Sequence, residues 1–240
     1  MTSEIGVDRL QNFKKDFKKL ENKEKGKLLQ RFFKTGKGEY GEGDIFAGLT
    51  VPQSRSLAVK YKDLDFPDIT FLLKSKIHEQ RLIALLILVH NFQKKPLEQR
   101  TIYEFYLKNT KYINNWDLVD LSSHEIVGGY LEDKPKEVLL KLAKSKNLWE
   151  KRIAIISTFT FIRDKKFETS LRIAEILIGD KEDLIQKATG WMLREIGKRD
   201  LKTEEVFLKV YYQKMGRTGL RYAIEKFPEQ LRQKYLLGKI

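Results

Sequence analysis

Apolar residues recur along most of the chain at the three- and four-residue spacing of amphipathic helices, and the alternation typical of strands is hard to find. The first helical pattern spans Val7 to Lys34 and is rich in lysine. A later one, residues 149–163, has a charged start and is then apolar almost all round, which predicts a buried helix. Proline is scarce and stands where helices are expected to begin, at Pro67, Pro96, Pro135 and Pro228. The pattern predicts an all-α fold.

The longer and more apolar helices are predicted to begin at an interval of roughly 33–38 residues. The expected starts are Ile77, Asn115, Leu148, Asp183 and Arg217. Short polar turns separate them. An interval of this length is typical of stacked helix pairs, which usually form a curved solenoid whose inner helices line a concave groove. We therefore predict an α-solenoid of helical repeats.

A glycine-rich segment interrupts the helical pattern near the N-terminus. Residues 35–44 contain four glycines and predict a loop, which we interpret as a linker in preference to a flexible arm or a close backbone approach to DNA. The 240 residues, 41% of them hydrophobic, suffice for one sizeable core. We predict a single domain over residues 1–240, with an N-terminal helical region at 1–34, the loop at 35–44 and helical repeats at 45–240.

Composition narrows the classes of function. Lys and Arg outnumber Asp and Glu by 47 to 33, giving a net charge of +14, which favours a polyanionic partner. Charge alone leaves a protein that is merely basic as an equal alternative. The absence of cysteine excludes disulfides, thiol catalysis and cysteine metal sites. No other residues show metal-ligand spacing, and there is no glycine-rich phosphate loop of the NTPase kind. We expect neither a metal nor a cofactor.

The same sequence predicts where the protein acts. The most apolar run, Leu82 to His90, is too short to span a bilayer, and the N-terminus lacks the pattern of a signal peptide. We therefore expect a cytoplasmic protein that does not enter the membrane, and separately we expect a monomer.

Two helical stripes hold the candidate site residues. Trp116 and Asp120 are four residues apart, which places them on one helix face. The second stripe follows the spacing i, i+4, i+7 and i+11 and consists of Lys187, Trp191, Arg194 and Lys198. Cations around an exposed aromatic ring suit a nucleic acid surface. The alternative is that the tryptophans are core residues and that Asp117 and Asp120 cap a helix.

Arg152 and the histidines allow more than one interpretation. Arg152 lies at the charged start of the apolar helix, where it could bind a phosphate at the rim or form a structural salt bridge. His124 follows Asp120 by four residues and could touch it, but a surface or packing role is favoured. Asp117 is expected to cap or pair, and His78 and His90 to be structural.

Three motifs in this order resemble the AlkD-like DNA alkylation repair glycosylases, a family built from HEAT-like helical repeats. They are Trp-Asp-x-Val-Asp at 116–120, Trp-x-x-Arg at 149–152, and Gln-Lys-Ala-x-Gly-Trp-x-Leu-Arg-Glu at 186–195. With weaker matches near 51–55 and 221–226, the resemblance covers most of the chain. It implies an α-solenoid of HEAT-like repeats with a concave basic groove.

The resemblance also implies a function and roles for single residues. Family members remove purines alkylated at N3 or N7 from duplex DNA without flipping the base. By position, Asp120 matches the catalytic carboxylate, Trp116 and Trp191 match the tryptophans beside the deoxyribose, and Arg152 matches an arginine on the DNA backbone. Around them, the cations expected to hold phosphates are Lys187, Arg194 and Lys198. Two other functions stay open: a non-catalytic binder of damaged or branched DNA, and a scaffold that binds an acidic protein.

Overall fold

The all-α fold predicted from the sequence is confirmed by a computed structural model of the chain, which describes the backbone of residues 3–240 and the side chains of residues 9–240. Over this range no strand is present, although an isolated parallel bridge joins Ile45 to Ile77. Met1 and Thr2, which begin the predicted N-terminal helical region, lie outside the described residues.

The chain divides into two compact units, Met1–Ser122 and Ser123–Ile240. The predicted organisation as one domain and the predicted concave groove stay predictions. None of the described helices combines the length and hydropathy that crossing a bilayer requires.

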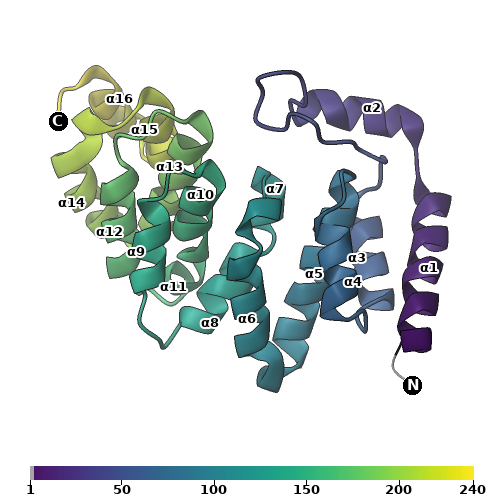
Figure 1. The fold of residues 1–240 in the computed structure, drawn as a ribbon. Coiled ribbons are helices and arrows are strands. Elements are labelled where there is room, and N and C mark those ends of the chain that lie inside the picture. Colours follow the sequence, from purple (N-terminus) through teal and green to yellow (C-terminus); the bar gives the residue numbers. More distant parts are fainter. Residues whose placement is uncertain (1–2) are drawn as a thin grey trace. The chain divides into compact units, whose positions relative to one another are not determined.

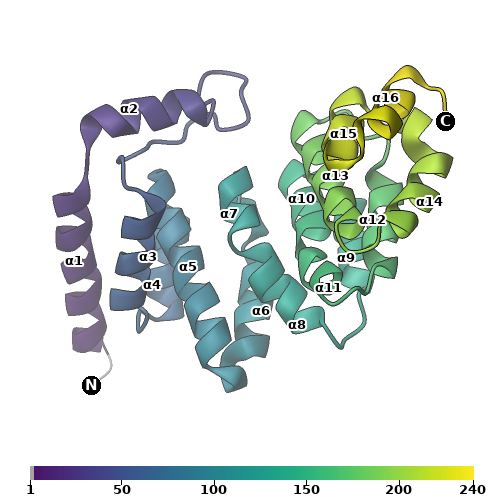
Figure 2. The ribbon, with the colours of Figure 1, turned by 180° about the vertical axis from the view of Figure 1, so that it is seen from behind.

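The first unit runs from purple to teal in Figure 1. Its helical elements are α1 (Ser3–Leu20), α2 (Lys23–Phe32), α3 (Val51–Lys60), α4 (Phe66–Leu73), α5 (His78–Lys94), η1 (Pro96–Glu98), α6 (Gln99–Lys108), η2 (Thr110–Tyr112) and α7 (Trp116–Asp120). Helix α5 is buried along most of its length and contacts α3, α4, α6 and α7, so it forms the core of this unit. Helix α1 packs beside α3, as both views show (Figures 1 and 2).

The helical pattern over Val7 to Lys34 forms two helices, and Asn22 separates them. The Asn22 side chain accepts a hydrogen bond from the Lys25 N–H at 3.0 Å and so caps α2. The backbone N–H of Asn22 donates to the Ala47 carbonyl at 2.8 Å. A local cap and a contact distant in sequence therefore end α1 and redirect the chain.

Glu79, in the first turn of α5, anchors the segment that leads into α3. Its carboxylate accepts hydrogen bonds from the backbone N–H groups of Ala47, Gly48 and Leu49 at 2.9, 2.8 and 3.2 Å. Thr50 then opens α3 with a capping box. Because three donors share one buried carboxylate, this irregular backbone has its polar groups paired and is fixed against α5.

The second unit runs from teal-green to yellow in Figure 1. Its elements are η3 (His124–Gly128), α8 (Gly129–Leu131), α9 (Glu137–Ala143), α10 (Leu148–Ser157), α11 (Phe159–Arg163), α12 (Glu168–Leu177), α13 (Asp183–Gly197), α14 (Leu201–Tyr211), η4 (Tyr212–Lys214), α15 (Arg217–Ala223), η5 (Ile224–Lys226) and α16 (Glu229–Leu237). Helix α13 contacts α10, α12, α14 and α15 and is the centre of this unit (Figure 2).

Two predicted helices are shorter in the structure. The apolar helix expected at 149–163 is divided at Thr158, whose hydroxyl donates to the Ile155 carbonyl at 2.7 Å. The helix expected from Asn115 ends at Asp120, and the π-helical turn η3 follows after a short turn. The other predicted starts are confirmed, because α5, α10, α13 and α15 begin within one residue of them.

Candidate functional site

Helix α7 sets the spacing of the first candidate pair. Asn115 caps the helix, accepting a hydrogen bond from the Trp116 N–H at 2.8 Å, and its side-chain nitrogen donates to Asp44 at 3.2 Å. Trp116 and Asp120 are the first and last residues of α7, so they lie one helical turn apart. Both are half-buried. The structure thus agrees with the prediction that Trp116 and Asp120 share one helix face. Their catalytic roles stay predictions.

Three aromatic residues of α2 and the following loop hold the Trp116 indole. Phe33 stacks on it with ring centroids 5.0 Å apart and an interplanar angle of 10°. Phe32 meets it edge-on at 6.0 Å. The indole Nε1–H donates to the Tyr40 hydroxyl at 3.2 Å. Since Phe33 covers one face of the indole, a ligand that packs on this ring must take the opposite face.

The aromatic stack continues inward to a buried histidine. Phe46 lies on Phe33 at 4.7 Å, and His78 lies on Phe46 at 4.4 Å. The imidazole Nε2 is 2.7 Å from Asp117 Oδ2, and its Nδ1 is 3.3 Å from Asp44 Oδ2. This arrangement agrees with the expectation that Asp117 pairs and that His78 is structural.

Opposite charges stabilise this buried cluster. Burial alone would lower the pKa of His78, but the carboxylates of Asp117 and Asp44 outweigh it and raise that pKa. Burial likewise opposes the charge of Asp44, yet the His78 ring and the Arg81 guanidinium, 2.7 Å away, lower the pKa of Asp44. The cluster holds the backbone beneath Trp116 in place.

Asp120 lies beside a buried polar group of the same unit. Burial and the charge of Asp120 both raise the pKa of the Tyr106 hydroxyl, which is hydrogen-bonded to Ser122 at 2.9 Å. A half-buried carboxylate in such surroundings is weakly screened by water, so its charge acts strongly on a nearby cation.

Trp191 is the corresponding residue of the second unit. It is half-buried on α13, its Nε1–H donates to Glu195 Oε1 at 3.3 Å, and its ring centroid lies 6.2 Å from that of Phe159. His124 packs edge-on against Phe159 at 5.6 Å, and burial lowers the pKa of His124. This contact fits the packing role favoured for His124.

The predicted cations of α13, and Lys198, the residue that follows it, are each paired with a carboxylate. Lys187 lies 2.6 Å from Asp183, Arg194 forms an ion pair with Glu225, and Lys198 lies 2.6 Å from Glu195. None of these acids is among the site residues predicted from the sequence. The i and i+4 spacing of Trp191 and Glu195 is the signal by which one of them could have been found.

Glu195 is the centre of this second cluster. Its carboxylate also accepts a hydrogen bond from Arg199 at 3.0 Å. Burial on its own would raise the pKa of Glu195, but the Lys198 and Arg199 side chains outweigh it and lower that pKa. Glu195 therefore carries a charge that orients both the Trp191 indole and neighbouring cations.

Arg152 departs from the position expected of it. The sequence predicts it at the rim, but the residue is only 5% exposed, and one guanidinium nitrogen donates to the Leu184 carbonyl at 2.6 Å. That bond ties α10 to the first turn of α13. The expectation of a rim position is wrong, and the DNA-binding role of Arg152 stays a prediction.

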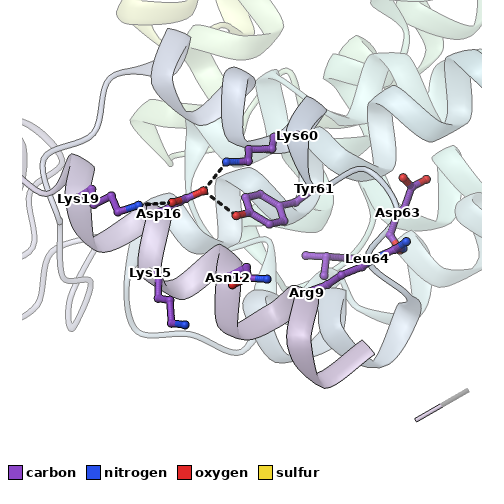
Figure 3. A pocket seen from close by; sticks show the side chains of 9 residues that line it. All are labelled: Arg9, Asn12, Lys15, Asp16, Lys19, Lys60, Tyr61, Asp63 and Leu64. Carbon is purple, nitrogen blue, oxygen red and sulfur yellow. Dashed lines mark hydrogen bonds and ion pairs between the residues drawn. The ribbon is translucent and has the colours of Figure 1, made fainter. Parts of the chain in front are cut away.

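A pocket of about 520 Å³ lies between α1 and the end of α3 in the first unit (Figure 3). The Asp16 carboxylate within it binds Lys19, Lys60 and the Tyr61 hydroxyl at 2.8, 2.5 and 2.8 Å. These partners lower the pKa of Asp16. The pocket contains none of the predicted site residues, and its acid already neutralises two of its cations.

Comparisons with known proteins point to one family. Residues 13–227 match the family described as DNA alkylation repair enzyme. A solved structure described as a predicted DNA alkylation repair enzyme from Enterococcus faecalis is similar in fold, with a TM-score of 0.66 and 17% sequence identity, over 87% of this chain and 97% of that one. Among curated proteins, none matches the chain.

Proposed function

The chain belongs to the DNA alkylation repair enzyme family, and from this membership we propose that it is a monofunctional DNA glycosylase of base-excision repair. It hydrolyses the N-glycosidic bond of purines alkylated at N3 or N7, in duplex DNA and without flipping the base. The observation that carries the proposal is the placement of Trp116 and Asp120 one turn apart on α7, both half-buried.

The charge of the substrate explains why one carboxylate suffices. A purine alkylated at N3 or N7 is a cation, and it leaves with both electrons of the bond to C1′ as a neutral base. Protonation of the leaving group by a general acid is therefore unnecessary, which removes one of the two carboxylates that glycosidases commonly use. Water supplies the oxygen that bonds to C1′ and releases a proton.

Asp120 supplies the electrostatic stabilisation in this proposal. Positive charge builds on the sugar near C1′ as the base departs, and a fixed carboxylate beside it lowers the free energy of that state. Asp120 also orients the attacking water and accepts its proton. The buried surroundings that it shares with Tyr106 support this role, because they limit screening of its charge.

The free face of the Trp116 indole receives the sugar in this proposal. An aromatic face attracts a nearby cation by about 0.5–2 kcal/mol, more where water is excluded. Phe33 leaves only one face of Trp116 for this purpose. Trp191, oriented by Glu195, offers the equivalent ring in the second unit.

Cations on α13 and at its C-cap bind the DNA backbone in this proposal. Lys187, Arg194 and Lys198 exchange their carboxylate partners for phosphates, with release of the counterions condensed on the duplex. We assign Arg152 to the phosphate beside the lesion. The substrate partner is thus double-stranded DNA with alkylated purines, bound by a monomer in the cytoplasm at the nucleoid.

The test is release of 3-methyladenine or 7-methylguanine from methylated duplex DNA under single-turnover conditions. The proposal predicts release well above the spontaneous rate. Release at only the spontaneous rate overturns it. In that case binding to the duplex would identify a non-catalytic DNA binder, and no binding at moderate salt would favour a protein-binding scaffold. Borohydride trapping of a covalent DNA adduct would contradict the monofunctional mechanism.

A further inference from the structure

The glycine-rich segment after α2 is a folded loop with its own hydrogen bonds. Glu39 accepts a bond from the Gly36 N–H at 2.8 Å, and Glu42 accepts one from the Gly38 N–H at 2.7 Å. The Gly41 N–H donates to the Lys34 carbonyl at 3.1 Å. These bonds close the loop onto the end of α2, so it presents its side chains from a defined frame.

Gly41 fixes the position of its neighbour Tyr40. A Cβ atom at residue 41 would lie 2.6 Å from the Phe33 carbonyl oxygen, closer than such atoms approach in proteins. The loop backbone therefore packs directly on the residue that stacks against Trp116. This close approach brings the Tyr40 hydroxyl within 3.2 Å of the indole nitrogen of Trp116.

Stacking and hydrogen bonding constrain different motions of the indole. The nearly parallel stack on Phe33 fixes the plane of the Trp116 ring and constrains rotation within that plane less strongly. The bond from Nε1 to Tyr40 fixes the orientation within the plane. A partly buried indole nitrogen also needs a hydrogen-bond partner, so the bond is favoured whether or not DNA is present.

We propose that Tyr40 is a positioning residue, which holds the Trp116 indole in the orientation that receives the deoxyribose of the lesion. This inference rests on the proposed glycosylase function. Tyr40 acts through Trp116 and does not touch the reacting atoms. Preorganisation of this kind raises the rate because the contact with the sugar is in place before charge develops on it.

The variant Tyr40→Phe tests the proposal, because it removes the hydroxyl and keeps the ring. Tyr112→Phe, in the same unit, is the matched control. We expect Tyr40→Phe to slow single-turnover excision by about fivefold, the effect of one hydrogen bond, while the affinity for an abasic-analogue duplex changes less than about twofold. The control should match wild type. An unchanged rate for Tyr40→Phe, or a rate loss with an equal loss of affinity, overturns the proposal.

A spectroscopic readout separates positioning from stability and from the proposed function itself. The three tryptophans give three indole N–H signals in a ¹H–¹⁵N spectrum, and the signal assigned by Trp116→Phe should shift and exchange faster with solvent in Tyr40→Phe. The unfolding midpoint should stay within about 2 °C. If wild-type protein excises no base, the proposed function fails, but this signal still tests whether Tyr40 orients the Trp116 indole. If the Trp116 signal does not shift in Tyr40→Phe, Tyr40 does not position Trp116 and the proposal is overturned.

Discussion

His78 Nε2 lies 2.7 Å from Asp117 Oδ2, and this buried pair joins the start of α5 to the short helix that holds Trp116 and Asp120. Because of this pair, burial distinguishes the two carboxylates of the helix, Asp117 and Asp120, as candidates for the catalytic role. Asp117 is 7% exposed and bonded within the protein, whereas Asp120 is half-buried at the other end of the same turn.

The raised pKa of His78 predicts that stability depends on pH. A folded-state pKa above the ordinary value of 6.5 gives stabilisation that is fully present below that value and lost as the pH rises through the folded pKa. As the pH rises above 6.5, we expect the thermal unfolding midpoint to decrease more in wild type than in His78→Gln. His90→Gln, on the same helix, is the control. Thermal unfolding from pH 6 to 9 measures this, and parallel curves for wild type and His78→Gln would contradict it.

Glu204 predicts a second pH effect, in the other unit. Burial raises the pKa of this 1%-exposed carboxyl to about 9, so the folded protein takes up a proton that the unfolded chain lacks between pH 4.5 and 9. Stability contributed by this group therefore falls as the pH rises through that window. Glu204→Gln should be more stable than wild type at pH 8 by roughly 2–4 kcal/mol, with little difference at pH 4.5. Urea unfolding at both values, with Glu205→Gln as control, checks this. A variant less stable than wild type at pH 8 would count against it.

Close packing of α13 against α15 predicts the effect of a single methyl group. A Cβ atom at Gly190 would lie 2.3 Å from the Gly219 carbonyl oxygen. Gly190→Ala should lower the free energy of unfolding by about 1–3 kcal/mol, because α15 must shift. Gly179→Ala, where the structure leaves open space, should be neutral. Denaturant unfolding compares the two, and equal stabilities would contradict the packing described.

The proposed phosphate contacts predict a change in salt dependence. Lys198→Ala should weaken binding to methylated duplex DNA and reduce the slope of log affinity against log salt by about 0.9, the value for one phosphate contact. Lys19→Ala, in the α1 pocket that contains none of the predicted site residues, should leave the slope unchanged. Fluorescence anisotropy over a range of salt concentrations measures both slopes. A slope that changes only in Lys19→Ala would move the DNA interface to α1.

The parts of the fold that were predictable depend on local pattern. The starts of α5 and α13 follow from apolar periodicity and polar turns that lie within a few residues of them. The break at Asn22 was not apparent, because it combines a cap with a hydrogen bond to Ala47, which is distant in sequence. The division at Thr158 depends on a side chain that bonds back to its own helix.

In the candidate site, too, local features can be predicted from the sequence, whereas contacts between distant residues cannot. The spacing of Trp116 and Asp120 is local, so the sequence alone gives their relative placement. The partner Tyr40 is 76 positions away from Trp116, and no periodicity connects the two. The sequence does not predict the buried position of Arg152, because its bond to the Leu184 carbonyl involves a backbone atom and so does not depend on the residue type at 184.

Single-turnover excision by Asp120→Asn tests the central claim most directly. The substitution removes the charge and keeps the shape, so the account predicts a rate about 100- to 1000-fold below wild type, with affinity for methylated duplex DNA and the unfolding midpoint nearly unchanged. Asp63→Asn, at an exposed carboxylate of the same unit, should keep the wild-type rate. A folded, DNA-binding Asp120→Asn protein that excises 7-methylguanine at the full rate would contradict the account.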